Sequence, residues 1–342
     1  MRLEHPEWRS HALWPVLLGC LFLAAPSFAE PIEIPFLSAR DLGTTEGPSV
    51  FFGDQRSSLR AGRCVVEAIE LGGYLPALDA VPALMREPLL SINSVSLLPG
   101  DDPLDILDDP ALAAPPVLYV HGYNIDFEKG CRRAALLKAN AHLEGRLLWF
   151  TWPSDGDVAN YSRDEADLYW SVPDLADLMI EMSERLGPDT PLDIIGHSLG
   201  ARGVALAAQQ VAFRRPDISL GHVVLVAPDM DFDIFERALP QIHQVSQGIT
   251  VYVSALDRPL NLSRQVHGYP RLGQADNPFW RLWGVSVVDV SDLEPPTPTG
   301  HLYHIHTKAV GDDMDLLLRQ NLRPSDRATL TQDTRNVWRL LP

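Results

Sequence analysis

The sequence is poor in cysteine and in positive charge. It has three Cys among 342 residues, and 28 Lys and Arg residues against 45 Asp and Glu, which gives a formal net charge of −17. Nucleic acids and anionic membranes bind positive protein surfaces, so this charge argues against both as partners. The chain also lacks internal repeats and low-complexity tracts, and its composition is typical of a globular domain.

Long hydrophobic runs are scarce as well. The run at residues 12–25 is short and contains a proline, so it does not predict a membrane span. Two arginines precede it and small residues follow it, which predicts a signal peptide over residues 1–29. We therefore expect an exported protein, periplasmic or secreted, with no stable transmembrane anchor in the mature chain. A lipoprotein signal, with Cys20 as the lipidated residue, is the less favoured alternative.

After cleavage of such a signal, two cysteines would remain, Cys64 and Cys131. In an exported chain they could form one disulfide, but the sequence does not decide whether they meet. We expect residues 30–48 to be an extended leader and residues 49–342 to form a single domain.

From residue 116 onward, short apolar runs alternate with helical stretches. This alternation predicts an α/β fold with a mostly parallel central sheet of about eight strands, buried on both faces by helices. The predicted strands are 50–52, 64–69, 117–120, 147–151, 192–195, 223–226, 249–254 and 285–290, and the predicted helices are 128–143, 164–186, 199–213 and 234–239. Residues 76–116 are rich in Pro and Asp and predict loops, with a short strand at 94–98.

Ser198 is the strongest candidate for a catalytic residue. It lies in the sequence GHSLG at residues 196–200, between a predicted strand and a predicted helix. That context is typical of a nucleophile elbow, in which a sharp turn exposes the serine Oγ at the edge of the sheet. Glycines on both sides avoid the clash that a Cβ would cause in such a turn.

A nucleophilic serine needs a base and an acid, which follow it in the order acid then histidine in an α/β-hydrolase. Asp257 directly follows the strand at 249–254 and is the favoured acid. Asp229 and Asp231, after the strand at 223–226, are alternatives, or they are loop-capping residues.

His301 is the favoured base because it follows the last strand and a flexible Pro-Thr loop. His304 and His306 lie close by in sequence and could be core or surface histidines. A zinc site formed by these histidines, with Asp312 or Asp313, is disfavoured because their spacing matches no zinc pattern. We therefore expect no metal and no cofactor.

Two backbone N–H groups are expected to form the oxyanion hole. Leu199, directly after the serine, provides one of them. Tyr123, in the HGYN sequence at 121–124 that follows the strand at 117–120, provides the other. For His121 we favour a structural hydrogen bond in this loop over a catalytic role.

Together these motifs resemble a bacterial family of α/β-hydrolases of unknown function. The resemblance covers roughly residues 50–318 and rests on HGYN at 121–124, TWPS at 151–154, GHSLG at 196–200, APDMD at 227–231 and SALDRPL at 254–260. It implies a serine hydrolase with Ser198, Asp257 and a histidine near Gly300, where the family's GHSY pattern favours His301. The chain departs from the family at Leu199, where Met is common, and at Arg202, where an Asn is expected nearby.

These observations predict hydrolysis of a small-molecule or lipid carboxylic ester. An acyltransferase or amidase using the same triad, or a non-catalytic envelope protein that binds a ligand on this scaffold, are the alternatives. The aromatic residues Phe279, Trp280 and Trp283 could line an acyl pocket, although core packing is the favoured explanation. Arg258 and Arg271 could bind a substrate anion, although solvation or ion pairing is favoured. The natural substrate and the oligomeric state are left open.

Overall fold

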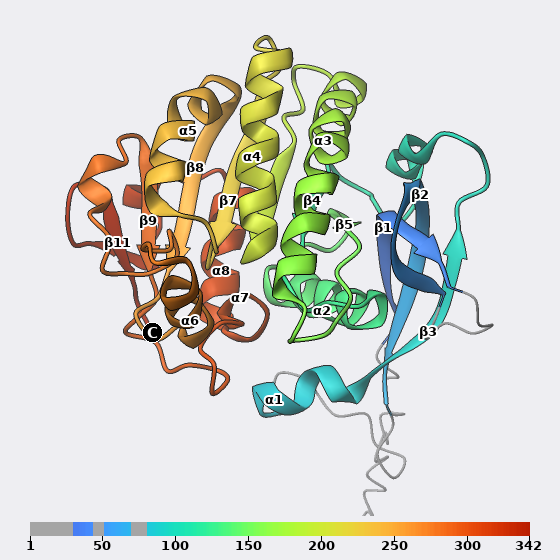
Figure 1. Ribbon diagram of the computed structural model, residues 1–342, viewed down its shortest axis with the longest axis horizontal. Helices are drawn as coiled ribbons and strands as arrows, with labels where there is room; N and C mark the ends of the chain where they lie inside the picture. Colours follow the sequence, from blue (N-terminus) through green and yellow to red (C-terminus); the bar gives the residue numbers. More distant parts are fainter. Residues whose placement is uncertain (1–29, 44–50, 70–80) are drawn as a thin grey trace, which may run out of the picture.

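The computed structural model describes residues 30–43, 51–69 and 81–342. The predicted signal peptide and Cys20 lie outside these residues. Within the described chain, one mixed sheet of 11 strands runs through the molecule in the order β10-β11-β9-β8-β7-β6-β4-β5-β1-β2-β3 (Figure 1). Among the described residues, no helix is long and apolar enough to cross a membrane.

The strands are β1 (Ile32–Leu42), β2 (Phe52–Ala68), β3 (Leu90–Leu97), β4 (Val117–Val120), β5 (Leu147–Thr151), β6 (Asp193–His197), β7 (Leu220–Val226), β8 (Ser246–Val253), β9 (Val285–Asp289), β10 (Leu330–Gln332) and β11 (Val337–Leu340). The helices are α1 (Ala83–Arg86), α2 (Phe127–Asn140), α3 (Tyr161–Leu186), α4 (Leu199–Arg214), α5 (Phe232–Val245), α6 (Arg258–His267), α7 (Tyr303–His306) and α8 (Lys308–Leu318).

The predicted α/β architecture is confirmed, but the described residues form a sheet of 11 strands where about eight were expected. The strands from β11 to β1 in the sheet order pair in parallel, whereas β2, β3 and β10 add antiparallel edges. Helices α3, α4 and α5 cover one face of the sheet, and α2, α7 and α8 cover the other (Figure 1). Successive residues of β4 and β5 point alternately into these two layers. Every residue of both strands is therefore buried, and nearly all of them are apolar.

The prediction of a leader over residues 30–48 is wrong for the part that the structure describes, residues 30–43. In place of a leader outside the domain, Ile32–Leu42 forms β1, which pairs in parallel with β5 and antiparallel with β2. The domain therefore begins well before residue 49. The strand predicted at 64–69 lies in the 17-residue strand β2 except for residue 69. Of the strand predicted at 50–52, only Phe52 belongs to β2, and residue 50 lies outside the described residues. In the region predicted as loops, β3 is longer than expected and α1 precedes it.

Cys64 and Cys131 form a disulfide between β2 and α2. Both side chains are completely buried in the layer that α2 forms with the sheet. The bond joins residues 67 positions apart and so links the antiparallel edge of the sheet to the helix that follows the HGYN loop.

Candidate active site

Ser198 lies at the sharp turn between β6 and α4. Its backbone has φ 55° and ψ −119°, a conformation that is rare for a residue with a side chain and that marks a strained position. A Cβ on Gly196 would lie 2.6 Å from the Ala201 Cα, and one on Gly200 would lie 2.1 Å from the His121 carbonyl oxygen. Both flanking glycines are therefore required by close backbone packing.

Asp257 and His301 are directly hydrogen-bonded. Asp257 follows β8 and caps the N-terminus of α6, where its Oδ1 accepts a hydrogen bond from the Leu260 N–H at 3.0 Å. Its Oδ2 accepts a hydrogen bond from His301 Nδ1 at 2.6 Å. The Asp257 side chain is fully buried and the imidazole is 12% exposed. Because a carboxylate only accepts, the proton lies on Nδ1 and leaves Nε2 able to accept another.

The loop that carries His301 is held against the one that carries Asp257. Gly300 has φ 67°, and a Cβ there would lie 2.4 Å from the Leu256 carbonyl oxygen. The Arg258 N–H also donates to the Thr299 carbonyl at 3.0 Å. These backbone contacts fix the position of the imidazole relative to the carboxylate.

Ser198 and His301 line the same cavity, which has a volume of about 640 Å³. Tyr123 and Asn124 of the HGYN loop, together with residues of α2, α3 and α6, line other parts of it. The structure thus brings two of the three residues expected to form a triad to one cavity and places the third behind the imidazole.

The HGYN loop lies against the nucleophile. A Cβ on Gly122 would lie 2.9 Å from the Ser198 Cβ, so only glycine permits this approach. Leu199 is the first residue of α4, and the N–H groups of a first helical turn have no partner within the helix. The expected oxyanion donors, Tyr123 and Leu199, therefore belong to the two segments that meet at Ser198.

Two buried charged residues hold the HGYN loop, and sequence reasoning missed both. Asp164 on α3 accepts hydrogen bonds from the Asn124 N–H at 2.9 Å, the Ser154 hydroxyl at 2.5 Å and the Asp155 N–H at 3.0 Å. Burial raises the pKa of Asp164. Arg40 on β1 donates to the carbonyls of Ile125 and Ser154, both at 2.7 Å. Burial lowers the pKa of Arg40 to about 10.

His121 has the structural role expected for it. Its Nδ1 donates to the Gly122 carbonyl at 2.8 Å, and its Nε2 lies 3.2 Å from the Thr151 hydroxyl. The ring stacks on Trp152, whose indole N–H donates to the His121 carbonyl. Burial holds the pKa of His121 well below its usual range, so the ring is neutral.

Asp229 and Asp231, the alternative acids, have other partners. Asp229 is buried and accepts hydrogen bonds from Arg271 Nε at 2.7 Å, Ser263 Oγ at 2.6 Å and the Tyr161 hydroxyl at 2.7 Å. Asp231 caps α5, where its side chain accepts a hydrogen bond from the Ile234 N–H. Within the described residues, neither of these carboxylates is hydrogen-bonded to His301, whereas Asp257 is.

The neighbouring histidines form a buried stack rather than a second base. His197 donates from Nε2 to the His301 carbonyl at 3.1 Å, and its ring stacks on His304 with 4.0 Å between centroids. Burial and the neighbouring imidazoles hold the pKa values of His197 and His304 well below their usual range. Burial also lowers the pKa of His306 to about 4. Among the described residues, no group of three or more His, Cys, Asp or Glu is arranged to hold a metal ion.

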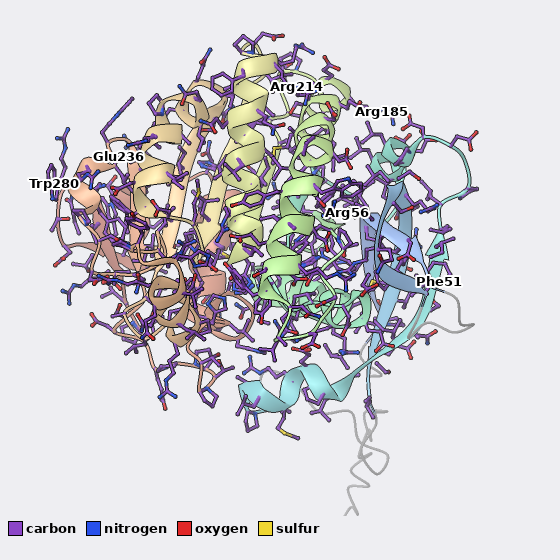
Figure 2. The ribbon with its side chains drawn as sticks, in the orientation of Figure 1. Phe51, Arg56, Arg185, Arg214, Glu236 and Trp280 are labelled. Atoms are coloured by element: carbon purple, nitrogen blue, oxygen red, sulfur yellow. A yellow bond between two sulfur atoms is a disulfide. The ribbon has the colours of Figure 1, made fainter. Side chains whose placement is uncertain are left out.

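The aromatic residues near the sheet edge do not line this cavity. Phe279 is buried in the core, as favoured, whereas Trp280 and Trp283 are 78% and 63% exposed. Trp280 projects from the surface near β11 and β9 (Figure 2). Of the two arginines considered as anion ligands, Arg271 is ion-paired with Asp229, whereas Arg258 lines the cavity.

A parallel sheet between two helical layers, with a strained serine after one strand and a hydrogen-bonded Asp–His pair after later strands, defines an α/β-hydrolase. Residues 115–319 match the family described as alpha/beta hydrolase of unknown function (DUF900). The chain belongs to this family, and the resemblance inferred from its motifs is confirmed. No curated protein matches the chain.

Solved structures show weaker similarities. The product of the lin2722 gene from Listeria innocua is 12% identical, with a TM-score of 0.39 over 66% of this chain and 98% of that one. The esterase Est22 with p-nitrophenol is 12% identical, with a TM-score of 0.37 over 85% of this chain and 81% of that one. TM-scores below 0.5 carry no information about what this chain acts on.

Proposed function

We propose that this protein is a serine hydrolase of carboxylic esters that uses Ser198, His301 and Asp257. The observation that carries the proposal is the 2.6 Å hydrogen bond from His301 Nδ1 to Asp257, with Ser198 and the same imidazole lining one cavity. Membership of an α/β-hydrolase family supports the reaction class. The buried carboxylate orients the ring and stabilises the imidazolium that forms during the reaction.

In this mechanism, Ser198 Oγ attacks the ester carbonyl while His301 Nε2 takes the hydroxyl proton. The N–H groups of Tyr123 and Leu199 stabilise the resulting oxyanion, each by about 3 kcal/mol in related sites. The tetrahedral intermediate then collapses: the bond to the alcohol oxygen breaks, and His301 returns the proton to that oxygen. Water, activated by the same imidazole, hydrolyses the acyl-serine and releases the acid.

Hydrolysis of p-nitrophenyl acetate and butyrate by the purified mature protein tests this proposal. We expect Ser198→Ala to lower kcat by about 10⁴-fold or more, because the nucleophile is lost. Ser162→Ala removes another serine that lines the same cavity and serves as the matched control. No release of p-nitrophenol by the wild-type protein, or equal rates for wild type and Ser198→Ala, would contradict the proposal. The first result would favour a non-catalytic binding protein.

We also propose that the protein is exported after cleavage at Ala29. The disulfide between Cys64 and Cys131 supports this, because such bonds persist in oxidising compartments. Cell fractionation with N-terminal sequencing tests it. The expected product is an exported chain that begins at Glu30, and an intact chain in the cytoplasm would contradict the proposal.

A further inference from the structure

The cavity at Ser198 is rich in positive charge although the chain as a whole is acidic. Lys129, Arg133 and Arg258 all line it, and Asp229 is the one carboxylate among its described lining residues. The full chain carries a formal net charge of −17. A cationic cavity within an acidic protein needs an explanation, because like charges that line one cavity repel one another.

Lys129 contacts the HGYN loop, which carries one of the expected oxyanion donors. It lies on α2, and its Nζ donates to the Asn124 carbonyl at 2.8 Å, one residue from Tyr123. In the described part of the chain, no carboxylate forms an ion pair with it. Burial, together with the charge of Arg133, lowers the pKa of Lys129. A carbonyl oxygen therefore holds the ammonium in place without neutralising it.

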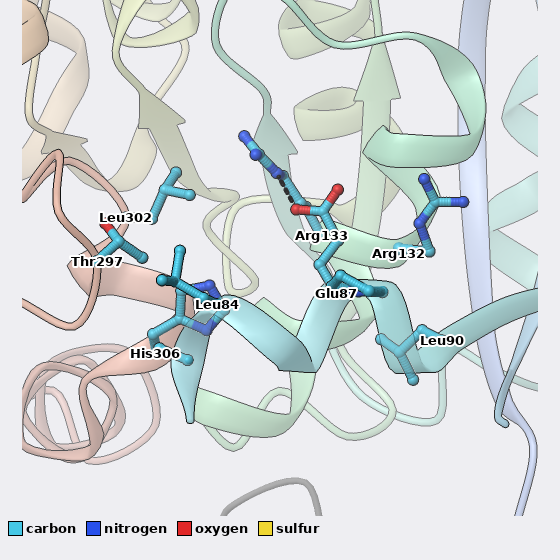
Figure 3. A pocket seen from close by; sticks show the side chains of 10 residues that line it. Leu84, Glu87, Leu90, Arg132, Arg133, Thr297, Leu302 and His306 are labelled. Atoms are coloured by element: carbon cyan, nitrogen blue, oxygen red, sulfur yellow. Dashed lines mark hydrogen bonds and ion pairs between the residues drawn. The ribbon is translucent and has the colours of Figure 1, made fainter. Parts of the chain in front are cut away.

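Arg258 lies beside the loops that carry Asp257 and His301. It directly follows Asp257, and its N–H donates to Thr299, two residues before His301. Its side chain is exposed and has no ion pair within the described residues. Arg133 differs, because its Nε donates to Glu87 at 2.8 Å (Figure 3). It stands between this cavity and a neighbouring one of about 490 Å³.

The carboxylate of Asp229 does not cancel these charges. It is already ion-paired with Arg271 at 2.7 Å and lies 3.7 Å from a nitrogen of Arg202. The charges of these buried arginines lower its pKa. Its oxygens also accept hydrogen bonds from Ser263 and Tyr161. The hydrogen bonds and ion pairs of Asp229 therefore involve neither Lys129 nor Arg258. Lys129 and Arg258 are therefore the lining cations that no carboxylate of the described residues pairs with.

We propose that the preferred substrates are esters that carry a carboxylate or phosphate group close to the scissile carbonyl, bound by Lys129 and Arg258. This inference rests on the proposed hydrolase function and names its substrate class. The Asn124 carbonyl holds Lys129 beside the HGYN loop, and Arg258 directly follows Asp257. An anion bound by either cation would therefore lie in the same cavity as Ser198 and His301. Much of the remaining lining is apolar: Leu260 is buried, and Leu262 and Val266 are largely exposed.

Matched ester pairs test the inference. p-Nitrophenyl hemisuccinate carries the charge on the acyl side, and 3-(4-acetoxyphenyl)propanoate carries it on the alcohol side. The methyl ester of each is its neutral counterpart. After subtraction of spontaneous hydrolysis, we expect the charged member of at least one pair to have a kcat/KM about tenfold higher, as for one charge-assisted hydrogen bond. The preference should decline as ionic strength rises.

Variants of the two cations identify the binding residues. Lys129→Met and Arg258→Met should each lower the ratio of charged to neutral kcat/KM towards one. Arg264→Met is the matched control, because Arg264 also lies on α6 but pairs with Asp276 outside the cavity. A ratio near one for both wild-type pairs, or a preference that neither cation variant changes, would overturn the inference. Hydrolysis of the neutral esters that depends on Ser198 would leave the proposed function standing in either case.

Binding to the Ser198→Ala protein gives a second readout that needs no turnover. The probes are phenyl phosphate, 3-phenylpropanoate and neutral benzyl alcohol, measured by calorimetry. Tighter binding of either anion supports the inference, and the stronger of the two identifies phosphate or carboxylate as the group. If neither anion binds more tightly than benzyl alcohol, the inference fails even where the enzyme proves to be inactive on esters.

Discussion

Asp257 Oδ2 accepts a hydrogen bond from His301 Nδ1 at 2.6 Å while Oδ1 of the same carboxylate caps helix α6. One side chain thus connects the start of a helix to the proposed base. A substitution that removes the carboxylate would therefore lose both the helix cap and the orientation of the imidazole. A substitution that keeps one oxygen acceptor separates these two effects.

Asp257→Asn should keep the cap and lose the orientation. The amide oxygen can still accept from the Leu260 N–H, but the amide NH₂ then faces His301 and moves the ring proton to Nε2, where it blocks proton transfer from Ser198. We expect kcat to fall by about 10⁴-fold, as for the same change in a serine protease, with little loss of stability. Kinetics and thermal unfolding measure the two effects.

Asp231→Asn is the control for this experiment. Asp231 caps α5 with the same type of hydrogen bond but lies outside the proposed triad. Its variant should retain activity. Equal activity of Asp257→Asn and wild type would contradict the role given to Asp257.

Gly122→Ala should impair catalysis through a steric contact. The new Cβ would lie 2.9 Å from the Ser198 Cβ and 3.1 Å from His197 Nδ1, so the loop or the serine must shift. A displacement approaching 1 Å lowers catalysis by about 100-fold. In the control Gly203→Ala, the nearest atoms to the new Cβ all belong to the Leu168 side chain, the closest being its Cδ1 at 2.8 Å, and Ala favours the helix. If Gly122→Ala is as active as Gly203→Ala, the loop does not form the oxyanion hole.

Loss of the disulfide should destabilise the fold without changing the active site. Closing a loop of 67 residues contributes about 4 kcal/mol to the free energy of unfolding, mainly through the unfolded chain. We expect the double variant Cys64→Ala, Cys131→Ala to lose about this amount in urea titrations. Reductant should destabilise the wild type and leave the double variant unchanged. Two thiols that react with Ellman's reagent in unfolded, unreduced protein would contradict the disulfide.

The free energy of unfolding should decrease as the pH is lowered, because of the buried histidine stack. Burial holds the pKa of His304 well below its ordinary value, and neither ring nitrogen has a hydrogen-bond partner within the described residues. Below about pH 6.5 the unfolded state binds a proton that the folded state does not, so acid favours unfolding. A histidine that stays neutral in the folded state lowers the free energy of unfolding by about 2 kcal/mol at pH 5.

His304→Phe should therefore lose less stability between pH 7 and pH 5 than the wild type. Denaturant titrations at both values measure the difference. His142→Gln is the comparison, because His142 is half-exposed beside Asp312 and lies outside the buried stack. An identical loss in His304→Phe and wild type would show that His304 is not the group responsible.

The sequence predicts the parallel centre of this fold well because buried strands there are short and apolar. Val117–Val120 and Leu147–Thr151 form the strands expected for them, with the same bounds. The order of Ser198, Asp257 and His301 likewise follows from the strands that each residue follows. A local sequence pattern is enough to predict a strand when the residues of that strand alone form the pattern.

The antiparallel edge is predicted poorly because its signals are mixed. Strand β1 contains a proline and buries Ser38 and Arg40, so its pattern is that of an irregular segment. Arg40 and Asp164 hold the HGYN loop from distant elements, and nothing local in the sequence distinguishes them from surface charges. Pairing between distant charged residues becomes visible only in three dimensions.

The most direct test of the account is the site of covalent labelling by a fluorophosphonate probe. We expect one adduct, on the Ser198 hydroxyl, when the labelled protein is digested and its peptides are mapped by mass spectrometry. Labelling should disappear in Ser198→Ala and weaken in His301→Ala. An adduct on another serine, or labelling of Ser198→Ala as strong as that of wild type, would contradict the account.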